Sequence, residues 1–437
     1  MARGVTAIRF RFETLGCKVN QFETQALETL LISRGHTAAA LGSGCDAVIV
    51  NTCAVTAEST RKSRQAVRRL KKLEPDAVVA VCGCFSQVSP EEVGSLGVDL
   101  IAGSGDRTKF VDELEHTVSD RTPRLLIDDP KKRRVFEALP AGSAAGRTRA
   151  MLKIQDGCQN FCTYCIIPYA RGPVRSMPPN LARIDAAQLG AAGYKEIVLT
   201  GIEISSYGTD LPDCPTLADV IRTVSMAAPD ARVRLGSLEP TVITQAFCAG
   251  LKTLPNICDH FHLSLQSGCD ETLRRMKRRY TTETFFKAIS LLRDYFPDCA
   301  VTADLIVGFP GETDDAFLKT LAFIKKCDFS SMHVFPFSRR PGTPAADMTG
   351  QIEKDVKQER AHRAAQEAKE MTHAYAGSCM GKTLNVLFER ETQGWSVGHA
   401  ANYMQVSVRQ TGLRGEIYPV RVIGEKERLL LGEIIKP

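Results

Sequence analysis

Short apolar runs alternate with amphipathic stretches over roughly the first 140 residues, a pattern typical of a Rossmann-like parallel α/β domain. The apolar runs predict strands at Ile8–Glu13, Ala47–Asn51, Ala77–Cys82, Asp99–Ala102 and Leu125–Ile127. The amphipathic stretches predict helices at Gln21–Ser33, Ala57–Lys72, Pro90–Leu96 and Lys109–Val118. A charged run at Lys131–Arg134, followed by small residues from Pro140 to Gly146, predicts a linker. We therefore expect a first domain at 1–141.

The alternation restarts near Arg149 with longer units. Strands are predicted at Met151–Gln155, Ile197–Thr200, Val233–Ser237, Phe261–Leu265, Val301–Val307 and Ser331–Pro336. Helices are predicted at Asn180–Ala192, Thr216–Ala227, Thr241–Thr253, Glu283–Asp294 and Asp314–Cys327. This succession of βα units predicts a parallel sheet that curls into a partial or full barrel of TIM type over 142–376, with its chemistry at the C-terminal ends of the strands.

A charged, alanine-rich helix is predicted at Gln351–Tyr375, after which the hydrophobic period changes to two. Five short strands follow at Thr383–Arg390, Trp395–His399, Met404–Arg409, Ile417–Ile423 and Arg428–Lys436. Strands of this length, separated by glycine-containing turns, predict a small antiparallel barrel of OB-like proportions over 377–437.

Composition narrows the classes of protein. The 437 residues are 43% hydrophobic and 24% charged, which excludes a disordered, collagenous or fibrous chain. The longest apolar runs are too short to span a bilayer, and arginines interrupt the apolar stretch at the N-terminus, so we expect no signal peptide and a cytoplasmic protein. The net charge of +6 permits a nucleic-acid partner without requiring one. The 15 cysteines, grouped at short spacing, are typical of metal or cluster ligands in a reducing compartment.

The most informative segment is a C-x3-C-x2-C pattern directly after a predicted strand, formed by Cys158, Cys162 and Cys165. Three thiolates in one short loop can bind three irons of a 4Fe–4S cubane and leave the fourth iron open. A zinc site prefers four protein ligands, and no fourth cysteine or histidine follows nearby. The alternatives are a structural zinc loop or three unrelated thiols.

Three further cysteines, Cys17, Cys53 and Cys84, each follow a predicted strand of the first domain. Because the C-terminal ends of parallel strands meet at one edge of a sheet, these thiols are expected to converge and to bind a second 4Fe–4S cluster. The alternative is that they are buried small hydrophobes. Cys82 makes the third ligand ambiguous, and we choose Cys84 because Cys82 lies within the strand whereas Cys84 lies beyond it.

The C-x3-C-x2-C segment, with Tyr164 before its last cysteine, resembles the radical S-adenosylmethionine (SAM) superfamily. The resemblance implies a partial (β/α)6 barrel in which the open iron binds SAM and one electron cleaves it to methionine and a 5′-deoxyadenosyl radical. It also implies SAM contacts from the ends of later strands. The residues implied in SAM binding are Tyr164, Thr200, Gly201, Glu203, Ser237, Glu239, Val307 and Gly308.

The segments Gly16–Gln21, Gly83–Gln87, Cys165–Gly172 and Gly201–Gly208 resemble the methylthiotransferase family, and its MtaB-type branch in particular. That branch methylthiolates C2 of N6-threonylcarbamoyladenosine beside the tRNA anticodon, using two SAM molecules and two 4Fe–4S clusters. Glu203 departs from the pattern, which places a neutral or imidazole side chain there. The alternatives are methylthiolation of N6-isopentenyladenosine or of a ribosomal-protein aspartate, and, in a different class, a non-enzymatic zinc-containing RNA-binding protein.

The expected partner is the anticodon stem-loop of tRNA. The C-terminal barrel resembles a TRAM domain, an RNA-binding module, and two basic segments next to the predicted clusters are suited to phosphate contacts. These segments contribute Arg61, Arg64, Arg68 and Lys72, and Arg274, Arg275, Arg278 and Arg279. The chemistry further implies an electron donor such as a flavodoxin or ferredoxin, and a sulfur source. We expect a monomer with no membrane contact.

Overall fold

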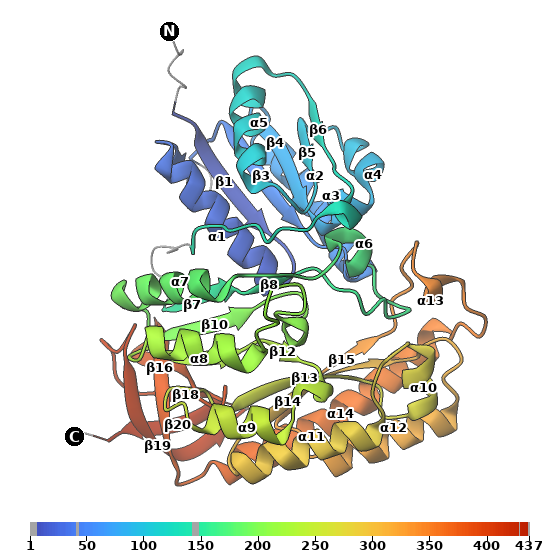
Figure 1. Cartoon of the computed structure of the whole chain (residues 1–437), viewed down its shortest axis with the longest axis vertical. Coiled ribbons are helices and arrows are strands. Elements are labelled where there is room, and N and C mark those ends of the chain that lie inside the picture. Colours follow the sequence, from blue (N-terminus) through green and yellow to red (C-terminus); the bar gives the residue numbers. More distant parts are fainter. Residues whose placement is uncertain (1–6, 41–42, 142–147, 428, 436–437) are drawn as a thin grey trace.

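The computed structural model describes residues 7–40, 43–141, 148–427 and 429–435. Three parts follow one another along the chain (Figure 1). An N-terminal sheet with its helices lies above a middle part made of parallel strands and outer helices, and a small C-terminal barrel lies to one side of that middle part. In the described residues no helix is both long enough and apolar enough to cross a membrane.

The N-terminal part is a six-stranded parallel sheet in the order β2-β1-β3-β4-β5-β6. Its strands are β1 (Arg9–Thr14), β2 (Thr37–Ala38), β3 (Ala47–Thr52), β4 (Val78–Gly83), β5 (Leu100–Ala102) and β6 (Arg124–Leu126). Its helices are α1 (Lys18–Ser33), α2 (Ala57–Leu73), α3 (Cys84–Val88), α4 (Pro90–Gly94), α5 (Arg107–Asp120) and η1 (Pro130–Lys132). Helices α1 and α5 cover one face of the sheet and α2, α3 and α4 the other, so β3 and β4 are buried throughout.

The middle part is made of parallel strands in sequence order and one small antiparallel pair, β8 with β9. The strands are β7 (Arg149–Lys153), β8 (Gln155–Asp156), β9 (Arg175–Ser176), β10 (Glu196–Thr200), β11 (Arg232–Leu235), β12 (Ser237–Leu238), β13 (His260–Gln266), β14 (Ala300–Val307) and β15 (Ser331–Pro336). The helical elements are α6 (Ile167–Arg171), α7 (Pro179–Ala191), η2 (Ile204–Ser206), α8 (Leu217–Ala227), η3 (Pro240–Val242), α9 (Gln245–Lys252), α10 (Asp270–Arg275), α11 (Thr282–Tyr295), α12 (Asp314–Cys327), α13 (Pro344–Asp347) and α14 (Lys354–Ser378).

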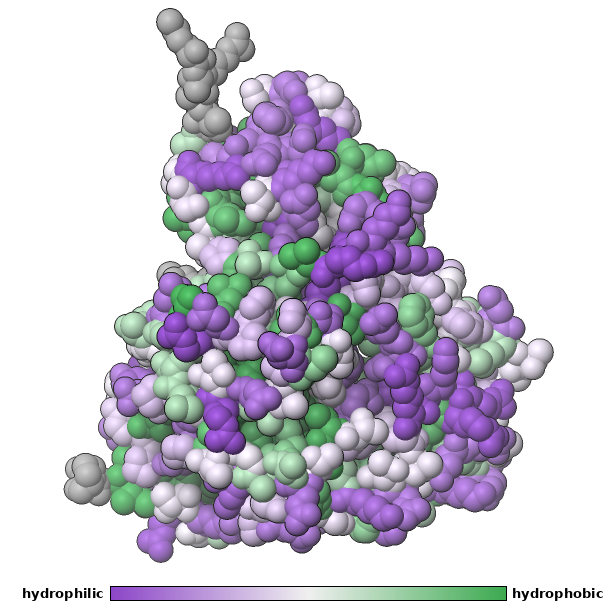
Figure 2. All heavy atoms as spheres, viewed as in Figure 1, coloured by the Kyte–Doolittle hydropathy of each residue, from purple (hydrophilic) through white to green (hydrophobic). Residues whose placement is uncertain are grey.

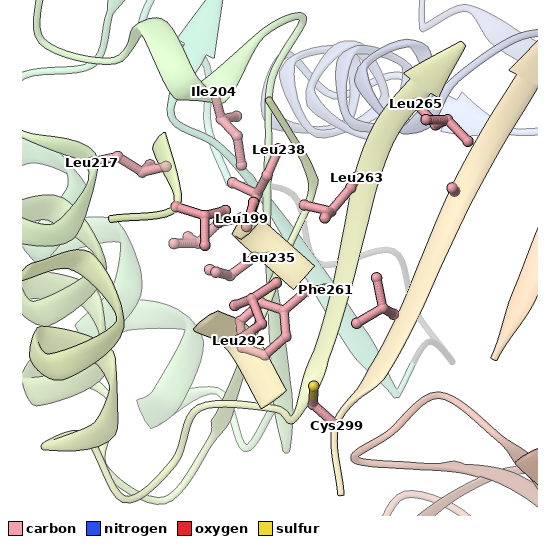
Figure 3. Close-up of a cluster of buried hydrophobic side chains, with 14 of the residues drawn as sticks. Leu199, Ile204, Leu217, Leu235, Leu238, Phe261, Leu263, Leu265, Leu292 and Cys299 are labelled. Carbon is pink, nitrogen blue, oxygen red and sulfur yellow. The ribbon is translucent and has the colours of Figure 1, made fainter. Parts of the chain in front are cut away.

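Two hydrogen-bonded sheets, β11-β10-β7 and β12-β13-β14-β15, make up the wall of the partial barrel. Only Gly236 separates β11 from β12, and a side chain there would lie 2.9 Å from the carbonyl oxygen of Leu199. Leucines of the strands and outer helices fill the core behind this wall, where Leu199 and Leu235 lie near Phe261 and Leu292 (Figure 3). The partial (β/α)6 barrel that the sequence predicts is therefore confirmed.

The C-terminal part is a closed barrel in the order β16-β17-β18-β20-β19, so the predicted barrel is confirmed. It is not antiparallel throughout as predicted, because β18 and β20 pair in parallel where the barrel closes. Its strands are β16 (Thr383–Thr392), β17 (Trp395–Ala400), β18 (Gln405–Val408), β19 (Ile417–Lys426) and β20 (Leu429–Ile434). Arg232 and Arg234 of β11 attach this barrel to the middle part. The Arg232 guanidinium donates to the carbonyl of His399 at 2.8 Å, and that of Arg234 donates to the carbonyl of Ala401 at 2.8 Å.

Some local predictions differ from the structure. The helix predicted at Pro90–Leu96 is shorter and is preceded by a separate helix, α3, whose first residue is Cys84. The short edge strand β2 has no hydrophobic pattern of its own and was not predicted. Most of the predicted linker, from residue 142 to 146, lies outside the described residues. The domain limits at 141 and 376 stay predictions.

Candidate active site

Cys158, Cys162 and Cys165 lie in the loop that follows β8, at the C-terminal end of the first barrel strand. Backbone hydrogen bonds fix this loop: the amide of Cys158 donates to the carbonyl of Gly172 at 3.0 Å, and that of Thr163 to the carbonyl of Met276 at 3.1 Å. Gly157 has a φ of +75°, and a side chain there would lie 1.9 Å from the carbonyl oxygen of Pro173. Only glycine fits at the entry to the loop, so the loop is shaped by its surroundings before any ligand binds.

All three thiols of this loop are free, and they are close enough to influence one another electrostatically. Burial raises the pKa of Cys158 and that of Cys165 to about 12. A thiol with such a pKa stays protonated at neutral pH unless a metal takes the place of its proton. The three residues fit an iron–sulfur cluster by their placement on one loop, where each thiol can bind a different iron.

A polar cavity of about 190 Å³ adjoins Cys162. It lies between the Cys162 loop and the ends of the second and third barrel strands. The lining residues are Asn160, Cys162, Glu203, Ser205, Ser206, Glu239, Thr241, Lys277, Arg278 and Arg279. Carboxylates, hydroxyls and guanidinium groups thus surround one space beside a thiol. This donor set fits a ligand that carries both an ammonium and a carboxylate, as SAM does.

Two of the eight residues predicted to contact SAM, Glu203 and Glu239, line this cavity. The other six lie at or near strand ends or in the cysteine loop. Thr200 ends β10 and Gly201 follows it, and Ser237 begins β12. Tyr164 packs against the cluster of buried residues that contains Met276. Val307 is buried at the end of β14, and Gly308 follows with a φ of +70°.

Glu203 and Glu239 differ in their partners. The amide of Ser205 donates to Glu203 at 3.0 Å, and the hydroxyl of Ser206 also donates to that carboxylate. Burial, and then the nearby carboxylate of Glu239, raise the pKa of Glu203 to about 7. Glu239 instead accepts from the Arg278 guanidinium at 2.5 Å. With this pKa, part of the Glu203 population carries a proton near neutral pH. The protonated form is neutral, like the side chain that the family pattern places there.

The second set of thiols lies at the C-terminal edge of the N-terminal sheet. Cys17 precedes α1, Cys53 follows β3, and Cys84 begins α3 directly after β4. Because β1, β3 and β4 are neighbours in the sheet, their three ends lie side by side. The thiols influence one another electrostatically, as Cys17 does with Cys53 and with Cys84. The structure thus brings the predicted triad together.

Cys82 and Cys84 point to opposite sides of the sheet. Cys82 packs with residues under α1 and α5, whereas Cys84 packs with Phe85, Ile166 and Ala170 on the other side. Burial raises the pKa of Cys82 to about 12. Cys84, but not Cys82, packs against Ile166 and Ala170 of the segment that follows Cys165, which favours Cys84 as the ligand.

Arg171 links the two parts of the site, and it was not predicted. The residue is fully buried at the end of α6, and its Nε donates to the Sγ of Cys84 at 3.2 Å. Its Nη2 donates to the Glu23 carboxylate at 3.0 Å and to the Oδ1 of Asn20 at 3.3 Å. Arg278 has a similar arrangement at the other triad, because its Nη1 donates to the Sγ of Cys162 at 3.2 Å while its Nη2 donates to the Glu239 carboxylate at 2.5 Å. Each triad therefore has one thiol beside a buried arginine that a glutamate holds.

Glu23 is the centre of a buried charge cluster between the N-terminal sheet and the barrel. Besides Arg171, it pairs with Arg107 at 2.6 Å and with Lys153 at 3.4 Å. Asp156 pairs with Lys153 at 3.2 Å. Burial alone raises the pKa of Glu23, but Arg107 and Arg171 outweigh burial and lower that pKa to about 2.

Replacing Glu23 with glutamine (Glu23→Gln) is expected to lower the free energy of unfolding by ~3–5 kcal/mol, because it leaves buried cations without their shared carboxylate. The folded-state pKa of about 2 lies below the ordinary 4.5, so this stabilisation is complete above pH 4.5 and is lost as the pH falls towards 2. Urea unfolding from pH 2 to 7 measures both effects, with Glu283→Gln on the surface of α11 as control. Equal stability of Glu23→Gln and the wild type at pH 7 would contradict this account.

The basic residues predicted to bind RNA lie in different environments. Arg68 and Lys72 of α2 are exposed, Arg61 pairs with Glu58 at 2.5 Å, and Arg64 pairs with Glu92 at 2.6 Å. In the second segment, Arg274 and Arg279 are exposed and Arg275 is half-buried. Arg278 differs from the rest, because its side chain is buried against Cys162 and Glu239. Hydrophilic side chains are dense on the right of Figure 2, where the N-terminal and middle parts meet.

In the part of the chain that the structure describes, no three His, Cys, Asp or Glu side chains are gathered as tightly as one metal ion requires. A cubane binds each thiolate at a different iron, so its ligands are spaced more widely.

Two protein families match parts of the chain. The Radical SAM superfamily matches residues 152–324, and the Uncharacterized protein family UPF0004 matches residues 9–103. The threonylcarbamoyladenosine tRNA methylthiotransferase MtaB of Bacillus subtilis is 40% identical over 94% of this chain and 93% of its own length. A tRNA-2-methylthio-N(6)-dimethylallyladenosine synthase of Acetivibrio thermocellus is 33% identical over 86% of this chain and 79% of its own length.

Among solved structures, the radical S-adenosylmethionine methyltransferase TsrM from Kitasatospora setae shares the fold, with a TM-score of 0.59 and 14% identity over 90% of this chain and 77% of that one. The MtaB relatives match nearly the whole chain, and the two family matches cover its N-terminal and middle parts. The chain therefore belongs to the radical SAM methylthiotransferase family, in its MtaB branch.

Proposed function

We propose that this enzyme transfers a methylthio group to C2 of N6-threonylcarbamoyladenosine beside the anticodon of tRNA. One observation carries the proposal. Two triads of free thiols come from different parts of the chain, and the contact between the short helices α3 and α6 connects them. Helix α6 starts two residues after Cys165 and packs on α3, whose first residue is Cys84. The family membership of the chain and the name of the Bacillus subtilis relative support the substrate.

Cys158, Cys162 and Cys165 would hold the cluster that binds SAM, and Cys17, Cys53 and Cys84 would hold the auxiliary cluster. When bound, the clusters and SAM supply the radical chemistry and the sulfur that the strong adenine C2–H bond requires. The chain itself positions these groups. Glu203 and Glu239 line the cavity beside Cys162, and Arg278 connects Glu239 to Cys162.

The contact between the N-terminal sheet and the segment after Cys165 keeps water away from this site. Ile166 and Ala170 pack over Cys84 and Phe85, and Arg171 closes the same contact with a buried charge. A reacting carbon radical is protected from side reactions where water is kept out. Turnover further requires an electron donor such as a flavodoxin or ferredoxin, and a source of sulfur. We place the enzyme in the cytoplasm, as a monomer.

The function is tested with anaerobically reconstituted protein, reductant, SAM and synthetic anticodon stem-loops. One RNA carries N6-threonylcarbamoyladenosine, one carries N6-isopentenyladenosine, and one carries adenosine. Mass spectrometry of the nucleosides is expected to show a methylthio product from the first RNA alone. A product from the isopentenyl RNA instead would assign the chain to the other substrate, and no product from any of the three would refute the proposal.

The exposed face of α2 is proposed to bind backbone phosphates. Replacing Arg61, Arg64 and Arg68 with glutamine is expected to weaken tRNA binding and to flatten its salt dependence by a slope of about one unit for each phosphate that is no longer neutralised. The effect at Arg68 is expected to be the largest, because Arg61 and Arg64 already pair with Glu58 and Glu92. Filter binding from low to high salt measures the slope.

Lys287→Gln and Lys319→Gln provide a control, since both lysines are exposed on outer helices of the barrel. An unchanged slope in the triple-arginine variant would show that α2 is only a solvated surface.

A further inference from the structure

A second cavity, of about 420 Å³, lies where the N-terminal part, the partial barrel and the C-terminal barrel meet. Lys18 and Gln21 line it from α1, Arg149 and Arg234 from the barrel strands, and Glu389 and Tyr403 from the C-terminal barrel. The first turn of α1 connects the cavity to the auxiliary triad, because Lys18 follows Cys17 directly and the amide of Gln21 donates to the carbonyl of Cys17 at 3.1 Å. Its volume is in the range of pockets that enclose small ligands.

Three cations and one carboxylate are among these lining residues. Arg149 pairs with Glu389 at 2.5 Å, and Arg234 pairs with Glu196 at 2.9 Å. Among the described residues, by contrast, none forms an ion pair or hydrogen bond with the ammonium of Lys18. The cavity therefore offers one uncommitted positive charge, which is suited to an anionic group of a ligand.

A rigid wall faces Lys18. Tyr403 has a φ of +69°, a conformation that is rare for an aromatic residue. Its ring stacks on His399 with the ring centres 4.9 Å apart, lies tilted against His260 at 4.9 Å, and has the Arg234 guanidinium 4.8 Å from its centre. Contacts from both sides hold the side chain in this strained position, so the wall is in place before a ligand enters.

We propose that Lys18 binds the carboxylate of the threonyl group of the substrate nucleoside in this cavity. This inference rests on the proposed function, because N6-threonylcarbamoyladenosine is the substrate that carries a carboxylate on its N6 substituent. Because Lys18 follows Cys17 in the chain, a side group bound at Lys18 is anchored one residue from a predicted ligand of the auxiliary cluster. The same charge discriminates against a dimethylallyl group, which would leave the ammonium unpaired.

The test measures binding without reductant, so that turnover plays no part. Fluorescence anisotropy compares three stem-loops, which carry N6-threonylcarbamoyladenosine, its threonine carboxamide, or adenosine. Wild-type protein is expected to bind the carboxylate RNA roughly tenfold to a hundredfold more tightly than the carboxamide RNA. Lys18→Gln is expected to bind the two RNAs equally, and Lys18→Arg to restore part of the preference.

Lys287→Gln, on the outer surface of α11, is the matched control and should keep the wild-type preference. Iron content shows that each variant still holds its clusters, and the comparison of carboxylate with carboxamide in the wild type needs no variant at all. A preference that survives in Lys18→Gln would overturn the proposal. So would an equal drop in affinity for all three RNAs, because Lys18 would then contact a backbone phosphate.

Failure of the proposed function gives a different result. In that case the wild type binds the carboxylate RNA and the adenosine RNA equally and forms no methylthio product from either. If the function holds and only the role of Lys18 is wrong, the wild type prefers the carboxylate RNA and Lys18→Gln does too.

Discussion

Replacing Cys158, Cys162 and Cys165 with alanine is expected to abolish reductive cleavage of SAM and to leave about half of the iron, as expected if each triad binds one cubane. The physical reason is that no other thiol adjoins the polar cavity beside Cys162 among the residues that the structure describes. The production of 5′-deoxyadenosine under reductant measures the cleavage, and iron analysis of the reconstituted protein measures the remaining cluster.

A matched control replaces Cys248, Cys299 and Cys327, which are three buried thiols of the barrel core. These substitutions remove the same number of sulfur atoms and are expected to keep both the iron and SAM cleavage. If the Cys158, Cys162 and Cys165 variant still formed 5′-deoxyadenosine, the assignment of the SAM-binding cluster would be wrong.

Replacing Cys17, Cys53 and Cys84 with alanine is expected to stop methylthio transfer without stopping SAM cleavage. SAM cleavage should persist, because the cavity beside Cys162 is unchanged, while transfer of the methylthio group to tRNA should stop. The iron content should again fall to about half. Nucleoside mass spectrometry and the yield of 5′-deoxyadenosine separate the two outcomes, and simultaneous loss of both would show that the triads do not act separately.

Single alanine substitutions at Cys82 and Cys84 test which of these two neighbouring thiols is the third ligand. Cys84 lies beside Arg171 and on the side of the sheet that faces α6, whereas Cys82 packs under α1 and α5. We expect Cys84→Ala to lose half of the iron and Cys82→Ala to keep it. The reverse result would exchange the two residues in the ligand set.

The fold could be predicted because hydrophobic periodicity reports local structure. The runs at Ala47–Asn51 and Ala77–Cys82 are continuously apolar, as strands covered on both faces must be, and both are central strands of the sheet. The change to period two after Gly381 likewise located the closed barrel. The thiols could be found because each follows a strand, and parallel strands end at a common edge.

The partners of these thiols could not be predicted in the same way. Arg171 and Glu23 are 148 residues apart, and nothing local in either segment indicates that they pair in the buried contact between two parts of the chain. Arg278 belongs to a basic run that is typical of a phosphate-binding surface, yet the fold turns this one side chain inward to Glu239. The sequence shows how many cationic side chains a segment has, but the tertiary packing determines which of them are exposed to solvent.

The contact between Arg171 and Cys84 also has a consequence for how the enzyme is assembled. The two residues are 87 positions apart, so during synthesis at ~5–20 residues per second the ribosome completes α6 on the order of ten seconds after Cys84. In that interval Ile166 and Ala170, which later pack over Cys84, do not yet exist. Cys53 and Cys84, which are buried in the folded protein, are therefore more accessible on the nascent chain than after the barrel has folded against them.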